Sequence, residues 1–353
     1  MNNSNITRKS DYTRLKKALS HQEADRVPYL EFWYVNQSVF EHVIGRKTKT
    51  IGWVGEDAKD PVEDVEFASG IGMDAVVSDY IYRPNNVTTC SSDGESHYST
   101  GTIKGWSDLA DIEPPPPIAE IEDKARRYAD AVRGTDLGCV HTFTGICDPV
   151  YLAMGLMDFS YMLADDLKFI EHMFDYFAYH ARRAVEAVAK FPEIEIFLLN
   201  DDVATGKGLF IGTPRMRDLW LPRIKWIIEP ALKAGKILAY HSDGDISQLI
   251  PMLLDMGFSG VHPVEPYAND IYALKKEYGK DIALIGNIDI TLLRFGTPKE
   301  IEEDVIRHCD GLKQGGGYIV SSSNSIIQQI PPENFLAMTN AVIEHGVYEG
   351  GAK

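Results

Sequence analysis

Short apolar runs rich in β-branched and aromatic residues recur along the chain, and segments with a helical spacing of apolar residues separate most of them. Such alternation is typical of parallel strands joined by crossover helices. Eight runs fit this description: 27–35, 75–81, 138–144, 195–200, 236–241, 260–264, 282–286 and 317–322. Eight units in one chain favour a closed (β/α)8 TIM barrel, with an open doubly wound sheet as the alternative.

One stretch departs from the alternation. Residues 87–106 carry threonines, Tyr98 and Ile103 around Asp93-Gly94, and an Asp-Gly pair suits a tight primed turn. We therefore expect a β-hairpin insertion after the second strand. The prolines at 114–117 read as a stiff connector within one domain. The expected organisation is a flexible tail over 1–10 and a barrel domain over 11–353.

The composition limits the classes of partner and the cellular location that we expect. With 353 residues, of which 44% are apolar, the chain can fold without a structural metal, so any metal would serve chemistry. A formal net charge of -17 argues against nucleic-acid and anionic-membrane partners. No apolar run approaches the ~20 residues of a membrane span, and the polar N-terminus is not a secretory signal. The four cysteines form no C-x-x-C pair. We expect a cytoplasmic protein.

The strand ends carry the candidate chemistry, because side chains there point to one mouth of a barrel. His241 and Asp243 lie two apart at the end of the fifth run, which puts them on one side of an extended strand, and Glu265 follows the sixth. A neutral imidazole with one or two carboxylates is a Zn²⁺ set with an open position. The same residues also fit a carboxylate-oriented acid/base histidine, or a structural network at the rim.

Weaker candidates stand at other strand ends. Asp79 lies within an apolar run, where an acid is costly without a partner. Functional and structural readings also remain open for the remaining polar and aromatic residues at strand ends, which are Trp33, Tyr34, His141, Asp201, Asp202, Asn287 and Asn324.

Three motifs lie at the ends of predicted strands: His241-Ser242-Asp243-Gly244, Pro263-Val264-Glu265-Pro266 and Gly286-Asn287-Ile288-Asp289. With Asp25-Arg26-Val27-Pro28 and Pro331-Pro332-Glu333-Asn334 near the two ends, they resemble the uroporphyrinogen decarboxylase superfamily, which includes the corrinoid-dependent methyltransferases. The resemblance covers nearly the whole chain. It implies a (β/α)8 barrel, which agrees with the eight runs counted above.

Several residues differ from the true decarboxylases. That branch has an arginine-bearing segment after its first strand, whereas residues 31–37 contain no arginine, and Ser323-Asn324 replace its H-G pair. Asp79 does match its pyrrole-binding aspartate in position. A porphyrinogen carries several carboxylates, so the missing arginines argue against that substrate.

The methyltransferase branch has an H-x-C zinc motif and a distant second cysteine. His241-Ser242-Asp243 has Asp in place of the first cysteine, and Asn324 lies near the position of the second. A His/carboxylate set leaves a harder, more Lewis-acidic metal, which suits an ether, hydroxyl or amine leaving group better than a thiol.

The resemblance thus implies an O-demethylase-type methyltransferase, which moves a methyl group from a small methylated substrate, most simply a phenyl methyl ether, to the Co(I) of a corrinoid on a partner protein. The expected roles are Zn²⁺ ligands (His241, Glu265, Asp243), catalytic residues (Asp79, Asp202, His141) and substrate contacts (Trp33, Tyr34, Asp201, Asn287, Asn324). The alternatives are a metal-free decarboxylase of a small acid that uses Asp79 and His241, and a non-catalytic sensor.

Overall fold

The computed structural model describes residues 8–48, 60–90 and 96–348. Its main sheet has seven strands, all parallel, in the order β1-β4-β5-β8-β9-β10-β11. The strands are β1 (Ala75–Tyr80), β4 (Gly138–Thr144), β5 (Ile194–Asn200), β8 (Ile237–His241), β9 (Gly260–His262), β10 (Ala283–Ile285) and β11 (Tyr318–Ile319). Seven of the eight predicted runs are thus confirmed as strands of one curled, TIM-barrel-like sheet.

The first predicted run, 27–35, forms only isolated parallel bridges, Tyr29 with Val320 and Tyr34 with Ile326. On its other side, one backbone and one side-chain bond to Asp74 stand where a ladder to β1 would run. The Tyr29 N–H donates to the Asp74 carboxylate at 3.0 Å, and Asp74 N–H donates to the Tyr29 carbonyl at 3.0 Å. The segment therefore lies between β11 and the start of β1, as a first barrel strand would, without being a continuous strand.

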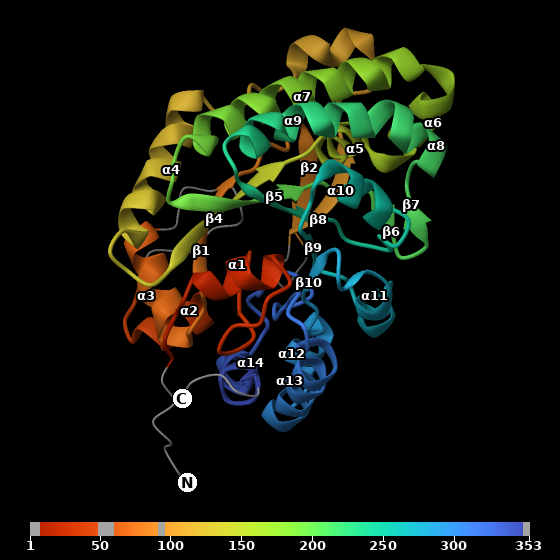
Figure 1. Ribbon diagram of the computed structural model, residues 1–353. Coiled ribbons are helices and arrows are strands. Elements are labelled where there is room, and N and C mark those ends of the chain that lie inside the picture. Colours follow the sequence, from red (N-terminus) through yellow and green to blue (C-terminus); the bar gives the residue numbers. More distant parts are fainter. Residues whose placement is uncertain (1–7, 49–59, 91–95, 349–353) are drawn as a thin grey trace.

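Helices follow the strands, as the alternation predicts. They are α1 (Thr13–Leu19), α2 (Gln37–Ile44), α3 (Pro61–Ile71), α4 (Ile118–Val132), α5 (Cys147–Met154), α6 (Leu156–Asp165), α7 (Leu167–Ala189), α8 (Thr213–Arg215), α9 (Leu221–Lys233), α10 (Ile250–Met256), α11 (Ile271–Tyr278), α12 (Ile290–Phe295), α13 (Pro298–Leu312) and α14 (Pro332–His345), with a 3-10 turn over Trp106–Asp111 and a π turn over Met216–Trp220. Figure 1 shows α4, α7 and α9 along one side of β1, β4, β5 and β8. Among the described residues, no helix combines the length and apolar character of a membrane span.

Two short antiparallel pairs interrupt the alternation. β2 (Asn86–Cys90) pairs with β3 (Ser96–Gly101), and β6 (Ala204–Thr205) pairs with β7 (Gly208–Leu209). The Asp93-Gly94 turn lies outside the described residues, so the hairpin turn stays a prediction. Residues 1–7 of the predicted tail also lie outside them, whereas Arg8 donates to the carbonyl of Gly70 and to Asn340 Oδ1.

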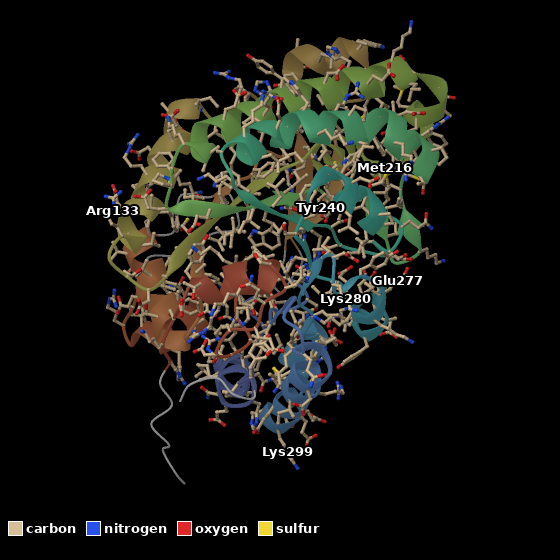
Figure 2. All side chains as sticks on the ribbon, viewed as in Figure 1. Arg133, Met216, Tyr240, Glu277, Lys280 and Lys299 are labelled. Carbon is tan, nitrogen blue, oxygen red and sulfur yellow. The ribbon has the colours of Figure 1, made fainter. Side chains whose placement is uncertain are left out.

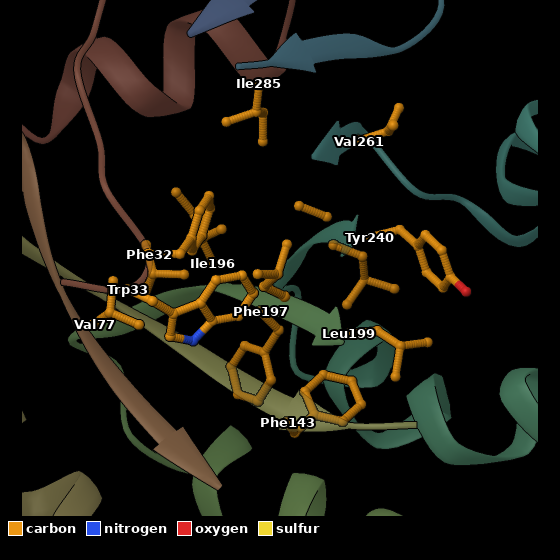
Figure 3. Packing of buried hydrophobic residues seen from close by; sticks show 14 of the residues in the cluster. Phe32, Trp33, Val77, Phe143, Ile196, Phe197, Leu199, Tyr240, Val261 and Ile285 are labelled. Carbon is orange, nitrogen blue, oxygen red and sulfur yellow. The ribbon is translucent and has the colours of Figure 1, made fainter. Parts of the chain in front are cut away.

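The alternation of side chains along β8 positions the functional site. Tyr240 packs its ring against Trp220 and Phe258, in the layer between sheet and helices, and Figure 2 shows it deep within the molecule. Its neighbour His241 therefore points to the other side. Inside the curl of the sheet, the Trp33 ring lies 4.6 Å from the His241 ring, and Figure 3 shows Trp33 and Phe32 surrounded by the strands.

Candidate active site

Three groups from two neighbouring strand ends meet at the mouth of the curled sheet. Asp202 follows β5, His241 ends β8, and Asp243 lies two residues beyond it. His241 Nε2 lies 3.6 Å from an Asp202 oxygen and 3.7 Å from an Asp243 oxygen, and the three ligand atoms lie within 4.8 Å of one another. The Asp243 N–H donates to Asp202 Oδ1 at 2.8 Å, which joins the two loops. We call Asp202, His241 and Asp243 the strand-end triad.

The electrostatics of the strand-end triad favour a cation. Burial, with the Asp202 and Glu265 carboxylates nearby, raises the pKa of Asp243 well above its usual range. Burial also raises the pKa of Asp202, although Arg83 opposes the shift. Burial, with a smaller contribution from Arg83, lowers the pKa of His241 to about 3, so its imidazole is neutral at physiological pH. Crowded carboxylates beside a neutral imidazole would be stabilised by a bound divalent ion.

A second histidine supports the first. His262, at the end of β9, places Nδ1 2.7 Å from His241 Nδ1. Both rings are buried, and the Phe32 ring lies 4.6 Å from the His262 ring. Because His262 engages Nδ1 of His241, Nε2 is the ring nitrogen that faces the two aspartates. The sequence analysis assigned no role to His262, although its place beside the His-x-Asp motif in a parallel sheet is a usable signal.

Behind the histidines lies a buried carboxyl group, Glu31, which is 1% exposed. The Ser322 N–H donates to it at 3.0 Å, and the Ser322 hydroxyl lies 2.5 Å from Oε2. The Ser321 hydroxyl lies 3.4 Å from Glu31 Oε2 and 3.4 Å from His262 Nε2. Burial raises the pKa of Glu31 to about 7, against the lowering effect of the Ser322 bonds.

One arginine faces the acidic site, and sequence reasoning missed it. Arg83 Nε donates to Asp148 at 2.5 Å, and the Asp148 side chain is 1% exposed. Its charge also acts on Asp202, His241 and Asp243. Arg83 follows the second predicted strand by two residues, so the strand-end rule applied to basic residues would have found it.

Glu265, predicted as a ligand, lies outside the strand-end triad in this structure. Its Oε2 accepts the Gly244 N–H at 2.6 Å, because the loop after Asp243 turns this amide toward β9. Asp202, predicted as a catalytic residue, takes the corresponding place beside His241. Glu265 instead lines a cavity of about 320 Å³ together with Tyr267, Asp289, Thr291, Ser323 and Asn324.

Two predicted substrate contacts lie where a bound molecule would meet them. Asn324 lines this cavity, and its amide nitrogen lies 3.3 Å from both Asp243 oxygens. Trp33 packs edge-on against His241, and its indole nitrogen is buried with no hydrogen-bond partner among the described residues.

Two predicted catalytic residues lie apart from the strand-end triad. Asp79 forms a 2.6 Å ion pair with Lys124 of α4 and lines a separate cavity with that helix. His141 Nδ1 lies 2.8 Å from the Ser78 hydroxyl, and its ring packs against Phe197. Asp79 is neutralised by Lys124, and His141 uses one ring nitrogen on Ser78 while its Nε2 is buried with no hydrogen-bond partner among the described residues. Neither residue is brought to the strand-end triad.

Three predicted substrate contacts are also engaged elsewhere. Asp201 accepts the Cys147 and Asp148 N–H groups at 2.7 and 2.9 Å and the Trp220 indole N–H at 2.7 Å, which fixes the start of α5. Asn287 bridges the Val264 carbonyl and the His308 ring. Tyr34 stacks on Phe40 and Phe67. Their polar or aromatic groups hold the scaffold.

The donor set fits zinc in type and nearly in spacing. Two ligand atoms on one tetrahedral zinc lie about 3.4 Å apart, so the two separations from His241 Nε2, 3.6 and 3.7 Å, need to close by only a few tenths of an ångström. The two carboxylate oxygens lie within 4.8 Å of each other. None of the described free cysteines belongs to this group, since Cys139, Cys147 and Cys309 are buried elsewhere. The residues present are therefore a nitrogen and oxygen set with room for a fourth ligand.

Comparisons with known proteins agree with this architecture. The model of the uroporphyrinogen decarboxylase (URO-D) family matches residues 105–345. Uroporphyrinogen decarboxylase from Enterobacter sp. (strain 638) is 34% identical over 79 residues, which are 22% of each chain. The enzyme from Citrobacter koseri is 34% identical over 76 residues, 22% of this chain and 21% of its own. These matches span only about a fifth of the curated relatives.

A solved structure resembles the whole chain. A methyltransferase from Methanosarcina mazei superimposes with a TM-score of 0.72 over 95% of this chain and 99% of its own, at 17% sequence identity. At this identity the likeness establishes the fold.

Proposed function

Because the chain belongs to the uroporphyrinogen decarboxylase family, we propose that it is a zinc-dependent methyltransferase of that superfamily. The methyl donor is a small methylated compound, most simply a phenyl methyl ether, and the acceptor is the Co(I) of a corrinoid on a partner protein. The strand-end triad carries this proposal, because it joins one imidazole and two carboxylates beside a cavity large enough for a small aromatic molecule.

The residues that would hold zinc are Asp202, His241 and Asp243. When bound, zinc supplies a Lewis acid that polarises the oxygen of the leaving group. Two carboxylates and one neutral imidazole give a harder ion than a thiolate set would, which supports an oxygen donor over a sulfur donor.

The chain's own side chains provide the rest of the site. Trp33, packed on His241, excludes water from one side of the strand-end triad. Asn324 holds the Asp243 carboxylate and faces the cavity, where its neighbours orient a substrate. Arg83, held by Asp148, offsets the charge of Asp202.

The alternative of a metal-free decarboxylase loses support from the geometry. That mechanism uses Asp79 and His241 together, but Asp79 is paired with Lys124 at 2.6 Å and does not join the strand-end triad. Arg83, which acts on the site, is already paired with Asp148, so it offers little to a substrate with several carboxylates.

An anaerobic methyl-transfer assay tests the proposal. The purified protein, loaded with zinc, is mixed with candidate Co(I) corrinoid proteins and a panel of methoxylated aromatics, and cobalt methylation is followed by absorbance. We expect zinc-dependent methylation with at least one donor, lost in His241→Ala and retained in His141→Asn. Release of CO₂ from a carboxylic acid by zinc-free protein, without cobalt methylation, would overturn it.

A further inference from the structure

We infer that Glu31 is a positioning residue for the metal site, acting through Ser321 and His262 to fix which ring nitrogen of His241 carries the proton. This inference rests on the proposed zinc site. It adds a residue from the first predicted strand, Glu31, whose hydrogen bonds among the described residues go to the two serines, and which determines whether His241 can be a ligand.

The first link is the contact between the two histidines. His241 Nδ1 and His262 Nδ1 are 2.7 Å apart, so one nitrogen donates its proton and the other accepts it. If His241 donates, its Nε2 keeps a lone pair toward Asp202 and Asp243. If His262 donates, neutral His241 carries its proton on Nε2, and that nitrogen cannot bind a metal.

The second link is the Ser321 hydroxyl. It lies 3.4 Å from His262 Nε2 and 3.4 Å from Glu31 Oε2, and a hydroxyl can donate to one neighbour while it accepts from the other. A carboxylate can only accept. With Glu31 ionised, Ser321 donates to Glu31 and accepts from His262 Nε2, which leaves His262 Nδ1 as the acceptor for His241.

While Glu31 is ionised, the order of donors runs in one direction, from His241 through His262 and Ser321 to Glu31. Its far end is anchored, since Ser322 donates its N–H to Glu31 at 3.0 Å and Glu31 is 1% exposed. Partners of a ligating histidine orient the ring and select its tautomer, and their loss typically costs about 10–100-fold in metal affinity.

Two variants break the order at different links. Glu31→Gln keeps the shape but can donate as well as accept, so both directions become available. Ser321→Ala removes the hydroxyl and leaves the carboxyl in place. Asp64→Asn is the matched control, because Asp64 is equally buried and bonds to the Tyr128 hydroxyl, outside this chain of contacts. The zinc Kd is measured by competition with a chromophoric chelator, and histidine ¹⁵N spectra of the metal-free protein report the ring tautomers.

We expect Glu31→Gln and Ser321→Ala to weaken zinc binding about 10-fold or more, and to add an Nε2-protonated signal for His241. Asp64→Asn should change neither. Wild-type Kd and tautomer in both variants would overturn the inference while the proposed function stood. If the wild type bound no zinc, the proposed function would fail, and the tautomer spectra alone would decide the inference.

Discussion

The strand ends of β1 and β4 and those of β5 and β8 each carry an acidic residue and a histidine, but only the second pair assembles a site. Asp202 and Asp243 both lie beside His241, whereas Asp79 and His141 each have a separate local partner. The difference lies in what surrounds the residues. Lys124 on α4 neutralises Asp79, and Ser78 bonds to Nδ1 of His141, while Arg83, whose charge acts on Asp202, is paired with Asp148.

The comparison shows that residue type and strand position are not enough to assign chemistry. A buried acid that is paired with a lysine is already neutralised. Two carboxylates beside a neutral histidine are not, and a bound cation would stabilise them. The test with the largest expected effect replaces each of the two histidines in turn. We expect His241→Ala to lower zinc affinity and methyl transfer by more than about 100-fold, since partners of a ligand alone are worth roughly 10–100-fold.

His141→Asn is the control for that measurement, because asparagine can still bond to Ser78. Zinc content by elemental analysis and the rate of cobalt methylation should stay within about twofold of the wild type. Equal losses in the two variants would show that the contrast between the two regions is unfounded.

A second test concerns Asp202 and Glu265, since we propose Asp202 as a zinc ligand in the place first predicted for Glu265. Asp202→Asn should weaken zinc binding by roughly 10–100-fold, because it removes a charged donor of the strand-end triad. Glu265→Gln should leave the zinc Kd within about threefold and act on the KM of the substrate, because Glu265 lines the adjacent cavity. Chelator competition and steady-state kinetics separate the two, and a greater loss of zinc in Glu265→Gln would reverse the exchange.

A third test addresses the β1 end. Asp79→Asn should leave zinc content and kcat unchanged. It should lower the free energy of unfolding by about 1–3 kcal/mol, because the Lys124 side chain is only 16% exposed and loses its charged partner. Urea denaturation measures the change. A large fall in kcat with unchanged stability would restore Asp79 to a catalytic role.

The smallest expected effect is a pH dependence. Burial lowers the pKa of His141 to about 3 from 6.5, so the folded state binds fewer protons than the unfolded state between these values. Stability from this residue is therefore lost as pH falls below 6.5, by up to about 1.4 kcal/mol per pH unit. Between pH 6.5 and 5, the unfolding free energy of the wild type should therefore fall relative to that of His141→Asn, by up to about 1.4 kcal/mol per pH unit. A constant difference would show that His141 is not held neutral.

Much of the fold follows from the sequence, because periodicity alone marks seven strands and the helices between them. The first run was less predictable, since Asp74 and Met73 side chains replace ladder partners at Tyr29 and Glu31. Within the site, the motif at 241–243 located two members of the strand-end triad. The spacing of residues could not show that the Gly244 N–H would take Glu265, or that Lys124 would take Asp79, because these partners come from distant elements.

The most direct measurement is zinc-edge anomalous diffraction from crystals of the zinc-loaded protein. We predict a single strong peak at the mouth of the sheet, within about 2.3 Å of His241 Nε2 and of one carboxylate oxygen from each of Asp202 and Asp243. A peak held by other residues, or an empty triad in fully zinc-supplemented crystals, would contradict the account.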